Sequence, residues 1–138
     1  MSSLRTAIDA NLLIGAWSGT STLLAAALAV LEDQRRTLIV SDALWLEVMP
    51  KAIYHRQEQE RAFYEAVFTR AEQVLWSTAL VESAKRLAQT YGLAAMDAIH
   101  LAVAISARAD EFISGEKPEK PIFRVTEITT RSLWGDRS

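Results

Sequence analysis

The most informative stretch of this chain is Thr6-Ala7-Ile8-Asp9-Ala10-Asn11-Leu12-Leu13, near the N-terminus. A short apolar run ends abruptly in the carboxylate of Asp9, and the amide of Asn11 follows. The pattern predicts a buried strand over residues 4–8 that brings Asp9 to the edge of a parallel sheet, where ligands bind beyond the carboxyl ends of the strands. Asp is also a preferred N-cap residue, and on this stretch alone a helix cap is the more frequent explanation of Asp9.

The composition is that of an ordinary globular protein. With 138 residues, of which 50% are hydrophobic and 23% charged, the chain can bury its own core, and we expect one domain over residues 1–138. The net charge of −2 gives no overall basic field, so a polyanion would have to be held by a local patch or a metal ion. The absence of cysteine excludes disulfides, thiolate metal sites and cysteine catalysis. No long apolar segment marks a leader or a membrane span, which predicts a cytoplasmic protein without membrane contact.

Further along the chain, short apolar runs alternate with segments of helical periodicity. Strands are predicted at residues 4–8, 38–40, 73–76, 111–114 and 122–125. Helices are predicted at residues 21–33, 43–48, 52–70, 78–91 and 94–107, with a turn at 15–20, a kink or restart at Pro50 and a frayed tail over 131–138 anchored by Trp134. The alternation predicts right-handed βαβ units and hence an α/β fold, in which helices flank a parallel sheet.

Four carboxylates stand where the local pattern does not require them: Asp9, Glu47, Asp97 and Glu116. Strand ends and the first turns of the following helices open onto one edge of a parallel sheet, so these acids can converge there although they are far apart in sequence. Converging carboxylates repel one another unless a cation or a proton intervenes. Oxygen ligands without cysteine favour Mg²⁺ or Mn²⁺ over zinc, and such sites perform phosphoryl chemistry. Helix caps and surface acids explain the same spacing equally well.

Three segments together resemble one protein family: Ile8-Asp9-Ala10-Asn11-Leu12-Leu13-Ile14, Leu46-Glu47-Val48-Met49-Pro50-Lys51 and Leu93-Ala94-Ala95-Met96-Asp97-Ala98-Ile99-His100-Leu101-Ala102. They resemble the PIN-domain ribonucleases, and most of all the VapC-type toxins of bacterial toxin–antitoxin pairs. The resemblance covers nearly the whole chain. It implies a three-layer sandwich with a five-stranded parallel sheet, an acidic pocket for Mg²⁺ or Mn²⁺, and endonucleolytic cleavage of RNA. It also implies a cognate antitoxin and a homodimer.

Carried over residue by residue, the resemblance assigns roles to the acids. Asp9, Glu47 and Asp97 match the three main acids of the family, with Asp9 and Asp97 as the primary metal ligands and Glu47 as a ligand or as the group that orients water. The family's fourth acid usually lies in a Ser/Thr-x-Asp pattern, where this chain has Ser114-Gly115-Glu116. The resemblance therefore implies that Glu116 serves a second metal ion or its water shell.

Three neighbouring side chains also bear on the site, and two of them have two interpretations each. Asn11 either hydrogen-bonds a ligand or the phosphate, or caps a helix. Ser114 is expected to hydrogen-bond the residues that hold the metal ion rather than the ion itself. His100, one helical turn after Asp97 among apolar neighbours, is more often a core histidine than a catalytic base.

Other functions remain compatible with these residues. The leading interpretation is a metal-dependent ribonuclease toxin silenced by an antitoxin. A PIN nuclease acting alone in RNA processing is a second, and a catalytically weak or inactive PIN-fold binding module is a third, supported by Ser114-Gly115-Glu116. A flavodoxin-like or nucleotide-binding domain is less favoured because the chain has no glycine-rich phosphate loop.

Overall fold

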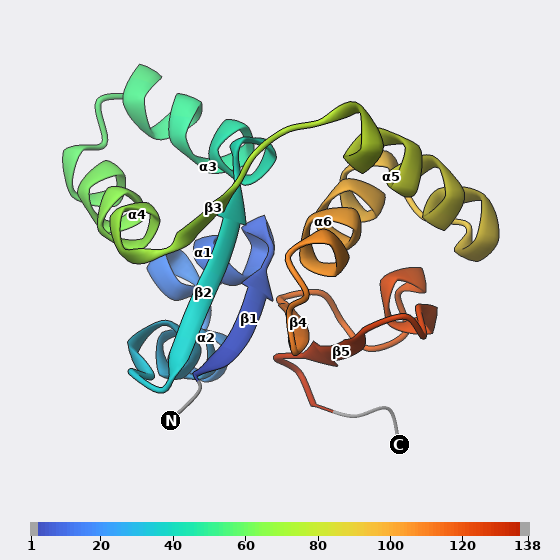
Figure 1. Cartoon of the computed structure of the whole chain (residues 1–138). Coiled ribbons are helices and arrows are strands. Elements are labelled where there is room, and N and C mark those ends of the chain that lie inside the picture. Colours follow the sequence, from blue (N-terminus) through green and yellow to red (C-terminus); the bar gives the residue numbers. More distant parts are fainter. Residues whose placement is uncertain (1–2, 136–138) are drawn as a thin grey trace.

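Five parallel strands form one sheet at the centre of the molecule, as seen in a computed structural model that describes residues 3–135 (Figure 1). In spatial order the strands are β3 (Glu72–Val74), β2 (Arg36–Ser41), β1 (Leu4–Ile8), β4 (Glu111–Ser114) and β5 (Thr129–Ser132). All four pairings are parallel. The order reverses between β1 and β4, and the carboxyl ends of these two strands mark the switch point at which ligands bind in open α/β sheets.

Helices cover both faces of the sheet, which confirms the predicted three-layer α/β fold. The elements are α1 (Ala10–Ser18), α2 (Ser21–Glu32), α3 (Asp42–Tyr54), α4 (Glu58–Arg70), α5 (Thr78–Tyr91), α6 (Ala95–Ser106) and the 3₁₀-helix η1 (Pro121–Arg124). Successive strand residues point to opposite faces. Thus Ile8 and Val40 belong to the core beneath α1 to α4, whereas Ala7 and Ile39 belong to the core beneath α5, α6 and η1.

The predicted fifth strand at residues 122–125 is wrong, because this segment forms η1. Ile122 and Val125 are both buried, and a spacing of three residues suits a 3₁₀ turn rather than a strand. The real fifth strand, β5, is a polar edge strand that contains Arg131 and Ser132, so the tail predicted to fray from residue 131 begins inside the sheet. Residues 136–138 of that tail lie outside the described range.

Of the kink or restart predicted at Pro50, the restart is wrong. Helix α3 continues through Pro50, because Val48, Met49 and Ala52 on either side of it are buried in one core cluster. The proline removes a single helical hydrogen bond, and packing outweighs that loss. The break falls later, at residues 55–57, where Arg56 has a positive φ of 55° and separates α3 from α4.

The predicted turn at residues 15–20 shortens to residues 19–20, since α1 continues to Ser18. Gly15 lies within this helix rather than in a turn. A Cβ at Gly15 would lie 3.0 Å from Cδ2 of Leu23, so the glycine permits close packing of α1 against α2.

Within residues 3–135, no single helix is long and apolar enough to cross a membrane. Only α1 and α2 together reach that length and composition, and they are bent by 117° to each other.

Candidate acidic active site

Asp9 occupies both positions that the sequence suggested, at the end of β1 and at the N-cap of α1. Its Oδ1 accepts the N–H of Leu12 at 2.9 Å, which caps the helix, and also the N–H of Gly115 at 3.1 Å. Its Oδ2 accepts a hydrogen bond from the Ser114 hydroxyl. The residue is 4% exposed. Burial raises the pKa of the Asp9 carboxyl, and these three hydrogen bonds oppose that shift because they favour the ionised form.

The loop after β4 brings Glu116 to the same edge of the sheet. The Glu116 N–H donates to the Ser114 hydroxyl at 2.9 Å, and the Asn11 amide donates to Glu116 Oε1 at 2.6 Å. A Cβ on Gly115 would lie 2.6 Å from the carbonyl carbon of Asn11, so only glycine allows the loop to approach α1 this closely. Asn11 therefore holds the Glu116 carboxylate, while Ser114 links that loop to Asp9.

Glu47 reaches the edge from α3, where it is hydrogen-bonded to Nε2 of His100 on α6. His100 is 4% exposed. An ionised carboxylate only accepts hydrogen bonds, so in a pair with the Glu47 carboxylate the imidazole would donate from Nε2. The sequence favoured a core histidine at position 100 and did not predict its hydrogen bond with Glu47. The signal available was the spacing, because His100 lies three residues after Asp97 and so on the same face of the helix.

Asp97 lies in the first turn of α6, and the charges of the other three acids act on its pKa. Its pKa is raised, first by burial and then by the negative charges of Glu116 and Asp9, with a smaller contribution from Glu47. The four carboxylates, contributed by the residue after β1, by α3, by α6 and by the loop after β4, are therefore near enough for three of them to act on the ionisation of Asp97. An anionic cluster of this kind favours a cation, which relieves the repulsion.

The donor set fits a hard divalent ion. Within residues 3–135 no three carboxylate or imidazole groups are close enough to form a complete ligand set. Mg²⁺ does not require one, because it keeps several water ligands and binds through one or two carboxylates. Asp9 and Asp97 are the residues that would supply these oxygens.

Replacement of Gly115 by alanine is expected to destabilise the protein by about 1–3 kcal/mol, because the new methyl group meets backbone atoms of Asn11 and Leu12. Urea unfolding measures this loss. Gly15→Ala is the matched control on α1: its Cβ meets only the flexible Leu23 side chain, and alanine favours a helix, so a change below about 1 kcal/mol is expected. Equal stabilities of the two variants would contradict the close approach described for Gly115.

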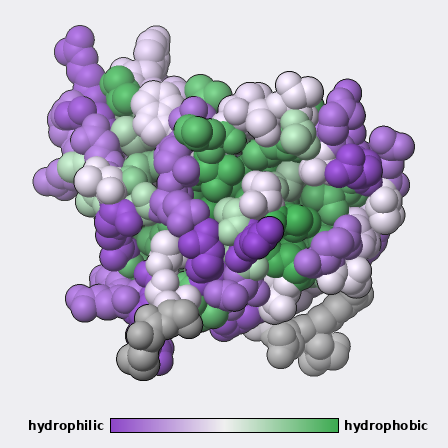
Figure 2. Space-filling model, in the orientation of Figure 1, coloured by the Kyte–Doolittle hydropathy of each residue, from purple (hydrophilic) through white to green (hydrophobic). Residues whose placement is uncertain are grey.

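An apolar cleft of about 530 Å³ adjoins the acidic residues between α3 and α6. Glu47 lies on its wall together with Leu46, Trp76, Met96 and Ile99. Leu46 is 65% exposed and Trp76 51% exposed. Figure 2 shows hydrophobic side chains gathered on this face of the molecule. Exposed apolar patches of this kind mark contact surfaces.

Solved structures similar to this chain are toxin–antitoxin complexes. A toxin–antitoxin complex from Klebsiella pneumoniae has 27% sequence identity and a TM-score of 0.64, over 90% of this chain and 98% of the other. VapBC2 from Rickettsia felis, bound to a DNA fragment from its promoter, has 13% identity and a TM-score of 0.69, over 94% and 98% of the two chains. FitAcB from Neisseria gonorrhoeae has 15% identity and a TM-score of 0.65, also over 94% and 98%. The latter two likenesses concern the fold alone.

The comparison with curated proteins gave no match. The family model of the PIN domain matches residues 6–119, which contain all four acids as well as Asn11 and Ser114. The resemblance found in the sequence is thereby confirmed, and the chain belongs to the PIN domain family.

Proposed function

We propose that this protein is a metal-dependent endoribonuclease and the toxin of a toxin–antitoxin pair. The observation that supports the proposal is the position of Asp97 near Glu116, Asp9 and Glu47: burial raises the pKa of Asp97 first, and the charges of these three acids raise it further. PIN domains are generally nucleases, and the similar structures come from toxin–antitoxin complexes. Both facts support a hydrolase of nucleic acids.

The residues of the chain have distinct tasks in this proposal. Asp9 and Asp97 hold a Mg²⁺ or Mn²⁺ ion, and the hydrogen bonds from Ser114 and from the N–H groups of Leu12 and Gly115 fix the Asp9 carboxylate in place. When bound, the ion supplies activated water and neutralises the charge that develops on the phosphate.

The other two acids are positioned by partners of their own. Glu47, oriented by His100, accepts a proton from the attacking water or completes the ligand set. Glu116, held by Asn11, serves a second ion or its water shell. The Ser-Gly-Glu sequence thus retains an acid at the edge of the site, which favours an enzyme over a binding module without activity.

We also propose a cognate antitoxin and a homodimer. The apolar cleft between α3 and α6 lies beside Glu47, so a peptide that fills the cleft would also cover the acidic residues. Trp76 and Leu46 are exposed on this surface, so a partner that covers them would bury apolar area. With RNA as its substrate, the protein is expected to act in the cytoplasm.

The experiment that tests the proposed function is cleavage of an internally labelled single-stranded RNA whose two ends are blocked. Products are expected with Mg²⁺ or Mn²⁺ and not with a chelator, and a DNA of the same sequence should be cut far more slowly. Blocked ends restrict the products to internal cuts. RNA that binds to folded protein but is never cut with either ion would instead support an inactive binding module.

The pairing of His100 with Glu47 gives a further prediction. His100→Ala and Glu47→Gln are each expected to lower the cleavage rate about 10- to 100-fold, since residues that orient metal-site groups have effects of this size. If His100 acts through Glu47, the double variant will be hardly slower than the worse single variant. Multiplicative losses in the double variant would contradict this pairing. Thermal unfolding of each variant identifies losses that come from the cavity left by the histidine.

A further inference from the structure

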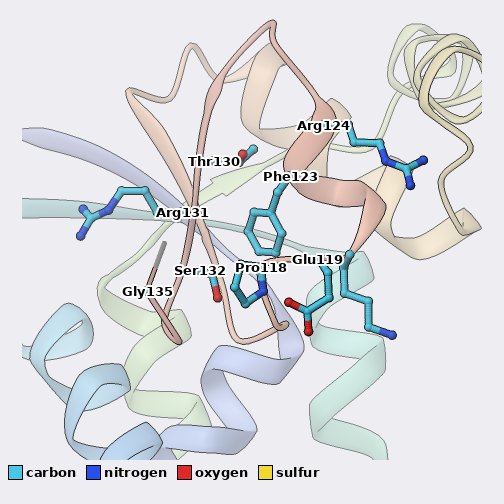
Figure 3. A pocket seen from close by; sticks show the side chains of 9 residues that line it. Pro118, Glu119, Phe123, Arg124, Thr130, Arg131, Ser132 and Gly135 are labelled. Carbon is cyan, nitrogen blue, oxygen red and sulfur yellow. The ribbon is translucent and has the colours of Figure 1, made fainter. Parts of the chain in front are cut away.

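A separate cavity lies on the other side of the loop that carries Glu116 (Figure 3). It has a volume of about 260 Å³ and is formed by this loop, η1 and β5, with Pro118, Glu119, Phe123, Thr130 and Ser132 among its walls. Pockets for drug-sized ligands start at roughly 300 Å³, so this cavity suits one small planar group.

Hydrogen bonds link residues beside the cavity to the loop that carries Glu116. The Ser132 hydroxyl donates to the Glu116 carbonyl at 2.6 Å, and the indole N–H of Trp134 donates to the Gly115 carbonyl at 2.9 Å. Pro118 follows Glu116 by two residues, a span of at most about 7 Å along the chain. A nucleotide in the cavity would therefore neighbour a phosphate at the acidic site.

The walls of the cavity combine flat apolar groups with one carboxylate, Glu119, and three cations, Lys120, Arg124 and Arg131. Figure 3 shows the rings of Phe123 and Pro118 close to the Glu119 carboxylate, while Arg124 and Arg131 extend outward in opposite directions. The Arg131 guanidinium is engaged by Glu111 at 2.9 Å. Within residues 3–135, the Glu119 carboxylate accepts no hydrogen bond. The Glu119 carboxylate is thus available to accept hydrogen bonds from a planar ligand with N–H donors.

We propose that this cavity binds one guanine base of single-stranded RNA beside the phosphate held at the acidic site, an inference that rests on the proposed nuclease function. Single-stranded bases are recognised by stacking on aromatic rings and by hydrogen bonds to their Watson–Crick edges. Guanine alone presents two adjacent donors on that edge, N1–H and the N2 amino group, which match the two oxygens of Glu119. Adenine, cytosine and uracil each offer one donor group there. Phe123 supplies the stacking surface.

Cations at and near the cavity complete the arrangement. Lys117 lies with its Nζ 5.6 Å from the centre of the Trp134 ring, and Arg124 is exposed on η1. Both are placed to meet the phosphates that flank a bound base, which is where cations belong on a single strand. In this proposal the Glu119 carboxylate recognises the base, and Lys117 and Arg124 bind the phosphates of the backbone.

Binding of short oligouridylates tests this proposal without any cleavage. Each carries one central guanine, adenine, cytosine or hypoxanthine, and fluorescence anisotropy is measured in the presence of a chelator. The guanine oligonucleotide is expected to bind about ten-fold tighter than the others, hypoxanthine included, because hypoxanthine lacks the N2 amino group. Glu119→Gln should abolish this preference, while Glu82→Gln on α5, an exposed carboxylate paired with Lys85, should retain it. Glu119 is exposed, so its variant should fold as the wild type does.

The outcomes separate this proposal from the proposed function. Equal affinity of the wild-type protein for all four oligonucleotides would overturn guanine recognition, as would a preference unchanged by Glu119→Gln, and metal-dependent RNA cleavage would stand in either case. Conversely, a guanine preference that depends on Glu119, in a protein that cuts no RNA with Mg²⁺ or Mn²⁺, would support the cavity and overturn the nuclease. Phe123→Ala should weaken binding of every base-containing oligonucleotide about ten-fold through lost stacking.

Discussion

Asp97→Asn is expected to lower RNA cleavage at least about 100-fold and at the same time to raise the unfolding temperature of the metal-free protein by a few degrees. The loss of activity follows from the loss of a charged ligand. The gain in stability follows first from burial of the Asp97 charge and then from repulsion, because Glu116, Asp9 and Glu47 all disfavour the ionised form. Asparagine keeps the shape of the side chain and removes the charge.

The stabilisation by Asp97→Asn should depend on pH. The pKa of Asp97 in the folded protein is raised above the ordinary value of 3.8, so the folded state binds this proton more tightly than the unfolded state does. The free energy of unfolding therefore falls as the pH rises from about 3.8 to the folded pKa, and it stays lowered at neutral pH. Thermal unfolding should show the gain of the variant at neutral pH and its disappearance near pH 3.8. Glu82→Gln is the control, and a lower unfolding temperature for Asp97→Asn at neutral pH would contradict the account.

Asp9→Ala is expected to cost about 2–4 kcal/mol of stability, whereas Asp9→Asn should cost far less. Alanine leaves the Leu12 N–H, the Gly115 N–H and the Ser114 hydroxyl without their acceptor in a site that is 4% exposed. Asparagine retains an oxygen for the two N–H groups, and its amide can donate to the Ser114 oxygen. Both variants should lose cleavage.

Urea unfolding of the two Asp9 variants separates the structural role of this residue from its chemical role. Similar stability of Asp9→Ala and Asp9→Asn would mean that the cap and the loop do not depend on Asp9. Cleavage that persists in the folded Asp9→Asn protein would remove Asp9 from the proposed metal site.

The sequence was sufficient for those parts of the fold that rest on local patterns. Strand β1 could be predicted because an apolar run stops at Asp9. The end of α5 could be predicted because glycine is the usual residue after a helix, and Gly92 indeed has the positive φ, 68°, that such a position requires. Strand β5 could not be predicted: it is polar and lies at the edge of the sheet, where pairing with β4 rather than burial makes it a strand. Helix α3 passes through Pro50 for a tertiary reason as well.

The same distinction holds for the candidate site. Strand ends meet at one edge of a parallel sheet, so the convergence of Asp9 and Glu116 followed from topology. The pairing of His100 with Glu47 needs the packing of α6 against α3, which no local pattern specifies. The cavity around Phe123 is formed by the loop at residues 118–120 together with η1 and β5, two segments whose structure the sequence did not predict.

Direct binding of Mn²⁺ tests the central claim that the four acids form a divalent metal site. Electron paramagnetic resonance measures the free ion, whose signal falls as protein binds it. We expect the wild-type protein to remove free Mn²⁺, Mg²⁺ to compete with that binding, Glu82→Gln to bind as the wild type does and Asp97→Asn to bind at least about ten-fold more weakly. Equal Mn²⁺ binding by the wild-type and Asp97→Asn proteins, or no binding by either, would contradict the account.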